Sequence, residues 1–381
     1  MNGNTPRPHI VFLVTEDWYF VSHRLSIAKA ALAAGYRVTV VTRVDRCEQA
    51  IRAAGIDVVH LPAQRGGLNP VQQLAYCLKV YRLYRRLRPD IVHHVAMKPV
   101  IYGSIAARLA GVHHVVNALG GLGFVFTSDA PKARVLRPLV NRLLHVAMGG
   151  ARTLLILQNR DDRRMIVEGG VIDDTQVRMI RGVGVNVESY PQPEARAGEC
   201  LVILPARLLR DKGVVEFAEA ARRLKAEGVA ARFALVGEPD EENPASLSPQ
   251  EISGWVEEGF IEAWGWRDDM PRVVAQADLV CLPSYREGLP KALLEACAAG
   301  KAIVTTDTPG CREVVEDGYN GLLVPVRNVD ALVDALRTLI GDSALRHRYG
   351  LNGRRLAQTQ FSEQAAIAAS LAVYRELVPA R

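Results

Sequence analysis

The sequence of 381 residues lacks the signatures of several common protein classes. Its cysteines form no Cys-x-x-Cys pair and no histidine pair has zinc-finger spacing, which argues against a structural zinc module. No strand candidate is followed by Gly-x-Gly-x-x-Gly, so the fingerprint of a dinucleotide-dependent oxidoreductase is also missing. We expect the cysteines to be small buried hydrophobic residues of a reducing compartment.

Long apolar runs are missing as well. No window approaches the roughly 20 continuous apolar residues that a membrane-spanning helix needs. Residues 1–8 are polar and lack the layout of a signal peptide. These absences predict a cytoplasmic protein.

Acidic residues are scarce in the first half of the chain. Residues 1–190 hold 25 Lys and Arg against 13 Asp and Glu, a net charge of +12. Residues 191–381 hold 22 against 28, a net charge of −6, so the whole chain carries +6. The basic half should therefore meet an anionic partner, for which nucleic acid, a membrane surface and a phosphorylated lipid are candidates.

Hydrophobic periodicity predicts an α/β protein. Short runs rich in Val and Ile, apolar at nearly every position, alternate with helical patterns such as 22–34 and 71–87. In the first half, the strand candidates are 9–15, 37–43, 57–61, 90–95, 113–119, 153–159 and 176–181. In the second half, they are 200–206, 232–236, 260–264, 279–283, 302–305 and 321–325. Such alternation predicts parallel, doubly wound sheets.

The length suggests two domains, and the alternation is interrupted once. Residues 186–199 hold prolines and acidic residues without apolar periodicity, so we interpret them as an interdomain linker. This predicts an N-terminal domain over 1–188, a C-terminal domain over 189–360 and a last helix, 361–381, that packs back towards the first domain. Two Rossmann-like domains would face each other across a ligand cleft at the carboxyl ends of their strands.

The clearest motif is PSYREGLPKALLE, from Pro283 to Glu295. It indicates a strand end, a glycine-containing turn and a helix that begins near Pro290, where proline is well placed. The N-terminus of such a helix attracts anions, and Glu287 and Glu295 can border one pocket and bind hydroxyl groups. A solvated helix start with acidic residues near the helix dipole is the alternative.

A second motif, Arg207-Leu-Leu-Arg-Asp-Lys-Gly213, follows the strand candidate 200–206 directly. The guanidinium of Arg207 and the ammonium of Lys212 suit a diphosphate at the mouth of the cleft. A charged surface loop is the alternative.

With this order and separation, the two motifs make the second half of the chain resemble the nucleotide-sugar domain of glycosyltransferase family 4, a retaining family with the GT-B fold. Further landmarks are ALVG at 234–237, WGWRDDMP at 264–271, ADLVCLPSYREGLPKALLEA at 277–296 and TDTPGCREVVEDGYNGLLVPVRNVDAL at 306–332. The resemblance implies a fold of two Rossmann-like domains and a nucleotide-sugar as donor.

The resemblance also implies roles for particular residues. Arg207, Lys212 and Glu287 would be catalytic, the two cations on the donor diphosphate and the carboxylate on the donor sugar. Further donor contacts would come from Trp266, Arg267, Gly288, Leu289 and Glu295, the last of these on the ribose. No metal and no cofactor is implied, and the absence of any Asp-x-Asp triplet weighs against a metal-dependent transferase.

The first half resembles bacterial members of the family that extend lipid-diphosphate-linked saccharides. The resemblance rests on WYFVSHRL at 18–25, AGYRV at 34–38, HHVAMKPVIYG at 93–103 and VVNALGGLGFVF at 115–126. Such members often transfer an N-acetylhexosamine from a UDP donor to undecaprenyl-diphosphate-linked glycans such as O-antigen. Acceptor contacts would come from Trp18, Phe20, His23, His94 and Lys98.

Two stretches depart from the family pattern. Residues 15–19 read Thr-Glu-Asp-Trp-Tyr where many relatives have a Gly-Gly pair, and Asn117-Ala-Leu-Gly120 replaces a stretch that often carries a histidine. We expect Asn117 to supply a hydrogen bond to the donor at that place. His23, His93 and His94 are candidates for the reacting centre without an assigned role, and a buried strand position is the alternative for His93.

Basic stretches in the first half indicate the kind of acceptor. Residues 76–88 interleave Leu and Tyr with Lys and Arg, and a second basic stretch covers 132–138. Such stretches attract anionic lipid headgroups and would hold the protein peripherally at the inner face of the cytoplasmic membrane. An ordinary solvated helix face is the alternative. Nucleic acid is disfavoured because no reading motif accompanies the cations.

These observations predict a retaining glycosyltransferase that moves a sugar from a UDP-sugar to an undecaprenyl-diphosphate-linked saccharide in surface-glycan assembly. Three alternatives stay open. A transferase with a soluble acceptor would work without lipid or detergent. A UDP-sugar epimerase or a phosphorylase would run another reaction on the same fold. A non-enzymatic nucleotide-sugar-binding protein would show no transfer.

Overall fold

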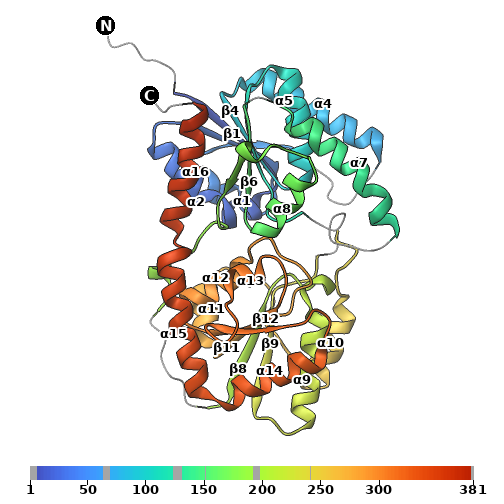
Figure 1. Cartoon of the computed structure of the whole chain (residues 1–381), viewed down its shortest axis with the longest axis vertical. Coiled ribbons are helices and arrows are strands. Elements are labelled where there is room, and N and C mark those ends of the chain that lie inside the picture. The colour runs from blue at the N-terminus through green and yellow to red at the C-terminus, as the bar shows by residue number, and fades with distance from the viewer. Residues whose placement is uncertain are drawn as a thin grey trace. The chain divides into compact units, whose positions relative to one another are not determined.

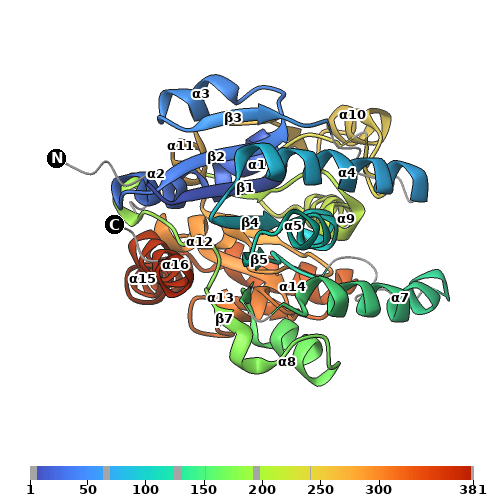
Figure 2. The same cartoon turned by 90° about the horizontal axis from the view of Figure 1, so that it is seen from above.

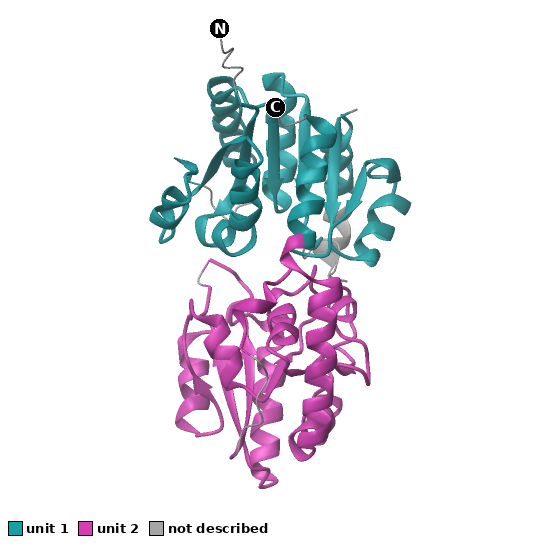
Figure 3. Ribbon diagram, turned by 90° about the vertical axis from the view of Figure 1, so that its left-hand side faces the viewer, with its two compact units in different colours: residues 1–183, 365–381 teal, residues 184–364 magenta. Residues whose placement is uncertain are grey.

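The computed structural model describes residues 7–62, 69–122, 131–150, 152–191, 198–240 and 242–378, without the side chains of 131–137. It divides into two compact units, shown in Figure 3. Unit 1 comprises residues 1–183 and 365–381, and unit 2 comprises residues 184–364. The middle of the predicted linker, 192–197, lies outside the described residues.

Unit 1 is built on a parallel sheet of seven strands in the order β3-β2-β1-β4-β5-β6-β7. Figure 2 shows β3, β2, β1, β4 and β5 side by side in this order. The strands are β1 (His9–Glu16), β2 (Arg37–Arg43), β3 (Asp57–His60), β4 (Ile91–Val95), β5 (His114–Ala118), β6 (Thr153–Leu157) and β7 (Val177–Met179). Each overlaps a strand predicted from an apolar run, and β1, β4, β5 and β6 are buried at nearly every position, as expected for strands covered on both faces.

The helices of unit 1 form two layers. In Figure 2, α2 and α16 lie on one side of the strands, and α4 and α5 lie on the other. The helices are α1 (Asp17–His23), α2 (Leu25–Ala33), α3 (Glu48–Ala53), α4 (Pro70–Leu87), α5 (Ser104–Ala110), α7 (Pro131–Met148), α8 (Arg160–Glu168) and α16 (Glu363–Leu377). A single π-helical turn, Pro99–Gly103, leads into α5.

Unit 2 repeats this design with a parallel sheet of six strands in the order β10-β9-β8-β11-β12-β13. Its strands are β8 (Cys200–Pro205), β9 (Ala231–Val236), β10 (Glu262–Ala263), β11 (Leu279–Leu282), β12 (Ala302–Thr306) and β13 (Gly321–Val324). Its helices are α9 (Val214–Ala226), α10 (Pro249–Glu257), α11 (Met270–Gln276), α12 (Lys291–Ala298), α13 (Cys311–Val314), α14 (Val329–Gly341) and α15 (Ser343–Gln360). The strand predicted over 260–264 is shorter than expected, since only two residues pair with β9.

Both sheets reverse their strand order at one point. In unit 1 the reversal lies between β1 and β4, and in unit 2 it lies between β8 and β11. In doubly wound sheets, ligands bind outside the carboxyl ends of the strands at this point, because the loops on either side part there. The fold therefore marks one candidate binding place in each unit.

The last helix returns to unit 1, as Figure 1 shows for α16 in red. Its residues Ala366, Val373 and Tyr374 are buried in the core that α2 shares with the sheet. The Tyr374 hydroxyl lies 2.6 Å from His93 Nδ1 on β4. Among the described residues, none of the helices has both the length and the apolarity required to cross a membrane.

Candidate active site

The two sequence motifs of unit 2 meet at the reversal point of its sheet. β8 and β11 are neighbouring parallel strands, so the loops after them leave from the same edge. The backbone N–H of Tyr285, in the second loop, donates to the carbonyl oxygen of Asp211, in the first loop, over 2.8 Å. The two loops are thus joined through their backbones.

Gly213 allows this close approach. Its φ is +71°, and a Cβ placed on it would lie 2.1 Å from the carbonyl oxygen of Pro283. No side chain fits at such a distance, and the left-handed backbone also favours glycine. Gly213, the final residue of the second motif, is therefore required by its contact with Pro283 of the first motif, and α9 begins directly after it.

Lys212 and Glu287 form the centre of the site. The Lys212 ammonium lies 2.6 Å from Oε1 of Glu287, and their side chains are 20% and 11% exposed. The hydroxyl of Ser284 donates to the same oxygen over 2.7 Å. An ion pair that is only partly exposed is held more firmly than a surface pair, because solvent screens it less.

Glu295 lies eight residues after Glu287, inside α12. Its side chain is 8% exposed, and one carboxylate oxygen lies 3.4 Å from the Lys291 ammonium. Burial raises the pKa of Glu295, while Lys291 and a hydrogen bond with Tyr190 act in the opposite direction. The carboxylate is thus fixed by two partners from within unit 2.

The other predicted donor residues lie in separate surroundings. Arg207 pairs with Asp240 over 2.6 Å rather than with Glu287, and Arg267 pairs with Asp269 over 2.7 Å. Trp266 is about half exposed. Neither the ion pairs of Arg207 and Arg267 nor the exposure of Trp266 indicates which part of a donor these residues would contact.

Gly288 and Leu289 hold the second loop in place. Gly288 meets Gly310, whose φ is +83° and whose added Cβ would lie 2.5 Å from the Gly288 carbonyl oxygen. Leu289 is buried in the core of unit 2. Its side chain therefore supports the loop, and any ligand contact at this residue must come from its backbone.

Sequence reasoning missed several residues that shape the site. Ser284 and Tyr285 lie within the first motif and were given no role, although their position there was a signal. The Tyr285 hydroxyl donates to Glu216 over 2.5 Å, and burial is the main reason why its pKa rises to about 12. Tyr190 lies in the predicted linker, where nothing in the sequence indicated its contact with Glu295.

Three residues predicted to touch ligands are buried in unit 1, where their side chains contact other residues of the core. Phe20 is fully buried against Phe12, with ring centroids 5.6 Å apart. His94 Nδ1 lies 2.8 Å from Asn117 Oδ1, and both side chains are inaccessible to solvent. The polar atoms of His94 and Asn117 thus hydrogen-bond to each other and to neighbouring side chains inside the core.

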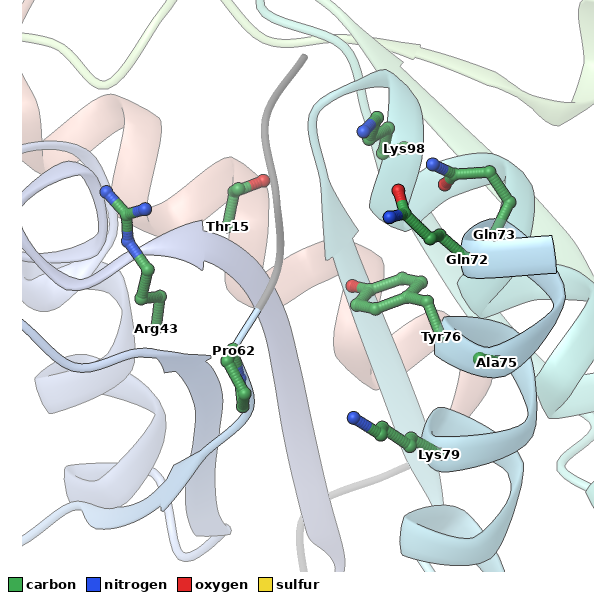
Figure 4. Close-up of a pocket in the computed structure, with 9 residues that line it drawn as sticks. All are labelled: Thr15, Arg43, Pro62, Gln72, Gln73, Ala75, Tyr76, Lys79 and Lys98. Atoms are coloured by element: carbon green, nitrogen blue, oxygen red, sulfur yellow. The ribbon is translucent and has the colours of Figure 1, made fainter. Parts of the chain in front are cut away.

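The remaining candidates of unit 1 are more accessible. Trp18 and His23 are half-buried, and the His23 ring stacks on Tyr19 with centroids 4.1 Å apart. Lys98 follows β4 and lines a cavity that Figure 4 shows. His93 is buried on β4 and hydrogen-bonds to Tyr374, which agrees with the alternative of a buried strand position for this residue.

The fold and the site define the class of protein: two doubly wound parallel-sheet units are the architecture of GT-B glycosyltransferases. Comparison with protein families agrees. Residues 187–356 match the family described as Glycosyl transferases group 1, and residues 9–159 match Glycosyl transferase 4-like. The chain therefore belongs to the glycosyltransferases that combine these two domains.

Two named relatives match three quarters or more of the chain. One is the N,N'-diacetylbacillosaminyl-diphospho-undecaprenol alpha-1,3-N-acetylgalactosaminyltransferase of Campylobacter jejuni, which is 28% identical over 93% of this chain and 95% of its own length. Another is the UDP-Gal:alpha-D-GlcNAc-diphosphoundecaprenol alpha-1,3-galactosyltransferase of Escherichia coli, which is 25% identical over 75% of each chain.

Solved structures share the fold. Sucrose-phosphate synthase from Thermosynechococcus elongatus has a TM-score of 0.78 at 19% identity and covers 97% of this chain and 99% of its own. Anabaena HepE in complex with UDP and glucose has a TM-score of 0.74 at 19% identity over 97% and 98% of the two chains.

Proposed function

We propose that this glycosyltransferase moves an N-acetylhexosamine from a UDP-sugar to an undecaprenyl-diphosphate-linked saccharide, with retention at the anomeric carbon. The observation that carries the proposal is the pair of Lys212 and Glu287, which joins the two donor motifs at the reversal point of unit 2. The relatives from C. jejuni and E. coli, named for transfer to diphosphoundecaprenol-linked sugars, support this class of acceptor. We assign the donor to the domain over 189–360 and the acceptor to the domain over 1–188.

The geometry suggests how the site would act. Lys212, with Arg207 in the same loop, would stabilise the negative charge that develops on the departing diphosphate. Glu287 uses Oε1 for Lys212 and Ser284, so Oε2 would be directed at a sugar hydroxyl. The bond from the anomeric carbon to the phosphate oxygen breaks, and the acceptor oxygen bonds on the same face. The acceptor proton passes to the departing phosphate oxygen, so the second product is UDP.

A ligand panel tests the donor assignment first. UDP, GDP, ADP and dTDP are added to the full chain, and the melting temperature is measured. A nucleotide at 100 times its Kd should add about 2.7 kcal/mol to the free energy of unfolding. We expect UDP alone to stabilise the protein. Stabilisation by GDP or ADP instead would refute the UDP-sugar and the N-acetylhexosamine together.

A transfer assay then tests the reaction. Radiolabelled UDP-GalNAc, UDP-GlcNAc, UDP-galactose and UDP-glucose are each offered with an undecaprenyl-diphosphate-linked sugar in detergent, and the product is analysed for its anomeric configuration. An α-linked product from an N-acetylhexosamine donor is expected. Transfer to free sugars at the same rate would support a soluble acceptor, and a β-linked product would contradict retention.

We also propose that α4 holds the protein at an anionic membrane surface. Val71, Leu74 and Leu78 are 75%, 62% and 43% exposed and recur at helical spacing along one stripe of α4. Exposed arginines at 82 and 85 continue the same stripe. Apolar side chains beside cations are typical of helices that bind the interface of a bilayer.

Co-sedimentation with vesicles tests this proposal. The protein should sediment with phosphatidylglycerol vesicles at low salt, and Leu74→Ser should weaken that binding without changing the melting temperature. Equal binding to neutral phosphatidylcholine vesicles would contradict an electrostatic contribution. The side chains of the second basic stretch, 132–137, lie outside the described residues.

A further inference from the structure

Unit 1 contains a cavity of about 390 Å³ at the reversal point of its sheet (Figure 4). Its lining residues are Thr15, Arg43, Pro62, Gln72, Gln73, Ala75, Tyr76, Lys79 and Lys98. Four neighbouring parallel strands contribute at or just beyond their carboxyl ends, and α4 closes the cavity from one side. A volume of this size is typical of a small-molecule site.

The lining is basic. Arg43 comes from the end of β2, Lys79 from α4 and Lys98 from the segment after β4, so three cations approach one volume from three elements. In Figure 4 the Lys79 ammonium and the Tyr76 hydroxyl point from α4 towards the side on which Arg43 and Thr15 lie. No carboxylate lines the cavity among the described residues; Glu16, which pairs with Arg43 over 3.0 Å, is buried and is not part of the lining.

Neutral donors complete the lining. The side-chain amides of Gln72 and Gln73 and the hydroxyls of Thr15 and Tyr76 can each donate to an oxygen of the ligand. Gln72 and Gln73 lie in the first turn of α4, where the helix dipole also favours an anion. Burial lowers the pKa of Lys98, because removal from water disfavours its charged form.

The position of α4 links this cavity to a lipid. Gln72, Tyr76 and Lys79 recur at helical spacing and form the stripe that lines the cavity. The exposed stripe of Val71, Leu74 and Leu78 runs along the same helix beside it. One helix thus presents polar groups to a cavity and apolar groups to the surroundings, which matches an amphiphile with an anionic head and an apolar chain.

We propose that this cavity binds the diphosphate of the lipid-linked acceptor, with Arg43, Lys79 and Lys98 as its cationic contacts. The inference rests on the proposed function for the identity of the acceptor. Cations that converge from three directions suit a group with many charged oxygens, and they would fix the acceptor by a part that every diphosphate-linked saccharide shares. The sugar that accepts the transfer then extends away from this anchor.

Lysine acetylation, read by mass spectrometry on the full chain, tests the cavity without any transfer. UDP is present throughout at saturation, so that the probe cannot bind at the donor site. The probes are millimolar inorganic pyrophosphate, a short-chain prenyl-diphosphate N-acetylhexosamine and phosphatidylglycerol vesicles. Lys29, which is exposed on α2 and does not line the cavity, serves as the control.

The expected result is that pyrophosphate and the prenyl-diphosphate sugar protect Lys79 and Lys98 and leave Lys29 reactive. No protection by either probe would overturn the proposal. Protection by the vesicles alone would overturn it too, because the cations would then bind lipid headgroups rather than a diphosphate.

Variant kinetics provide the second measurement. Lys79→Gln and Lys98→Gln should each raise the KM for the prenyl-diphosphate acceptor about tenfold or more, which is the loss of one charged contact. The KM for the UDP-sugar should stay the same, and Lys29→Gln should change neither value. Unchanged acceptor KM values would refute the site even if transfer occurs. Absence of any transfer in the wild type, with the lysines still protected, would refute the proposed function but not the cavity.

Discussion

The contact between Lys212 and Glu287 permits a direct test of what each residue does. The perturbation is a double-mutant cycle of Lys212→Met, Glu287→Gln and the combined variant, each of which removes a charge and retains similar bulk. The 2.6 Å ion pair is intermediate between an exposed pair and a buried pair, because its side chains are 20% and 11% exposed. Exposed pairs contribute about 0–1 kcal/mol and breaking a buried pair costs about 3–5 kcal/mol, so we expect a coupling of about 1–2 kcal/mol in the free energy of unfolding.

Turnover gives the decisive comparison. If Lys212 stabilises the departing diphosphate, Lys212→Met should lower kcat about 10²–10³-fold, the range seen when one stabilising donor is removed. The loss should persist in the Glu287→Gln background, because the diphosphate still needs the cation. The assay is transfer of radiolabel from the UDP-sugar under saturating substrates, and Lys225→Met, an exposed lysine on α9, is the control.

One result would refute the reasoning. If Lys212→Met lowers kcat in the wild type but has no effect in the Glu287→Gln background, Lys212 acts only by holding Glu287. The diphosphate would then have to be stabilised by Arg207 or by backbone groups at the start of α12.

Three further predictions concern stability. Gly213→Ala should lower the melting temperature far more than Gly228→Ala, because φ is positive at both but only at Gly213 would a Cβ strike backbone, 2.1 Å from Pro283; equal shifts would mean that backbone strain alone matters. Burial lowers the pKa of His94 to about 4, below its ordinary value of 6.5, so the unfolded chain binds more protons and the free energy of unfolding should fall as the pH drops through that interval. His94→Gln should weaken this pH dependence in urea unfolding, and an unchanged slope would contradict the assignment. Arg354→Met should cost about 3 kcal/mol or more, since its guanidinium is buried and donates to backbone carbonyls; a chemical denaturation midpoint like that of the wild type would contradict this.

The strands were predictable because both sheets are covered on both faces. Most of these strands are apolar at almost every position, and a predicted run overlaps each of the thirteen strands of the described residues, although β10 is much shorter than its run. The donor motifs were also predictable as neighbours, since parallel strands place their following loops at one edge. Their contact through Gly213 gives that expectation a physical cause.

Side-chain direction in unit 1 was not predictable. His93 and His94 are consecutive on β4 and therefore point to opposite faces, where Tyr374 of α16 and Tyr84 of α4 meet them. A sequence pattern places both histidines near a strand end, but it does not show which helix covers each face. The basic cavity could not be predicted from the sequence either, because Arg43, Lys79 and Lys98 are far apart in the chain.

The return of α16 to unit 1 affects how the protein folds during translation. Tyr374 completes the core around His93, yet it is translated after every residue of unit 2. Domains usually fold in the order in which they are made, but here the first unit must wait until the second has been synthesised, with the part of its core that α16 covers still exposed. A chaperone that shields apolar surface during translation would therefore be needed most for the half of the chain that emerges first.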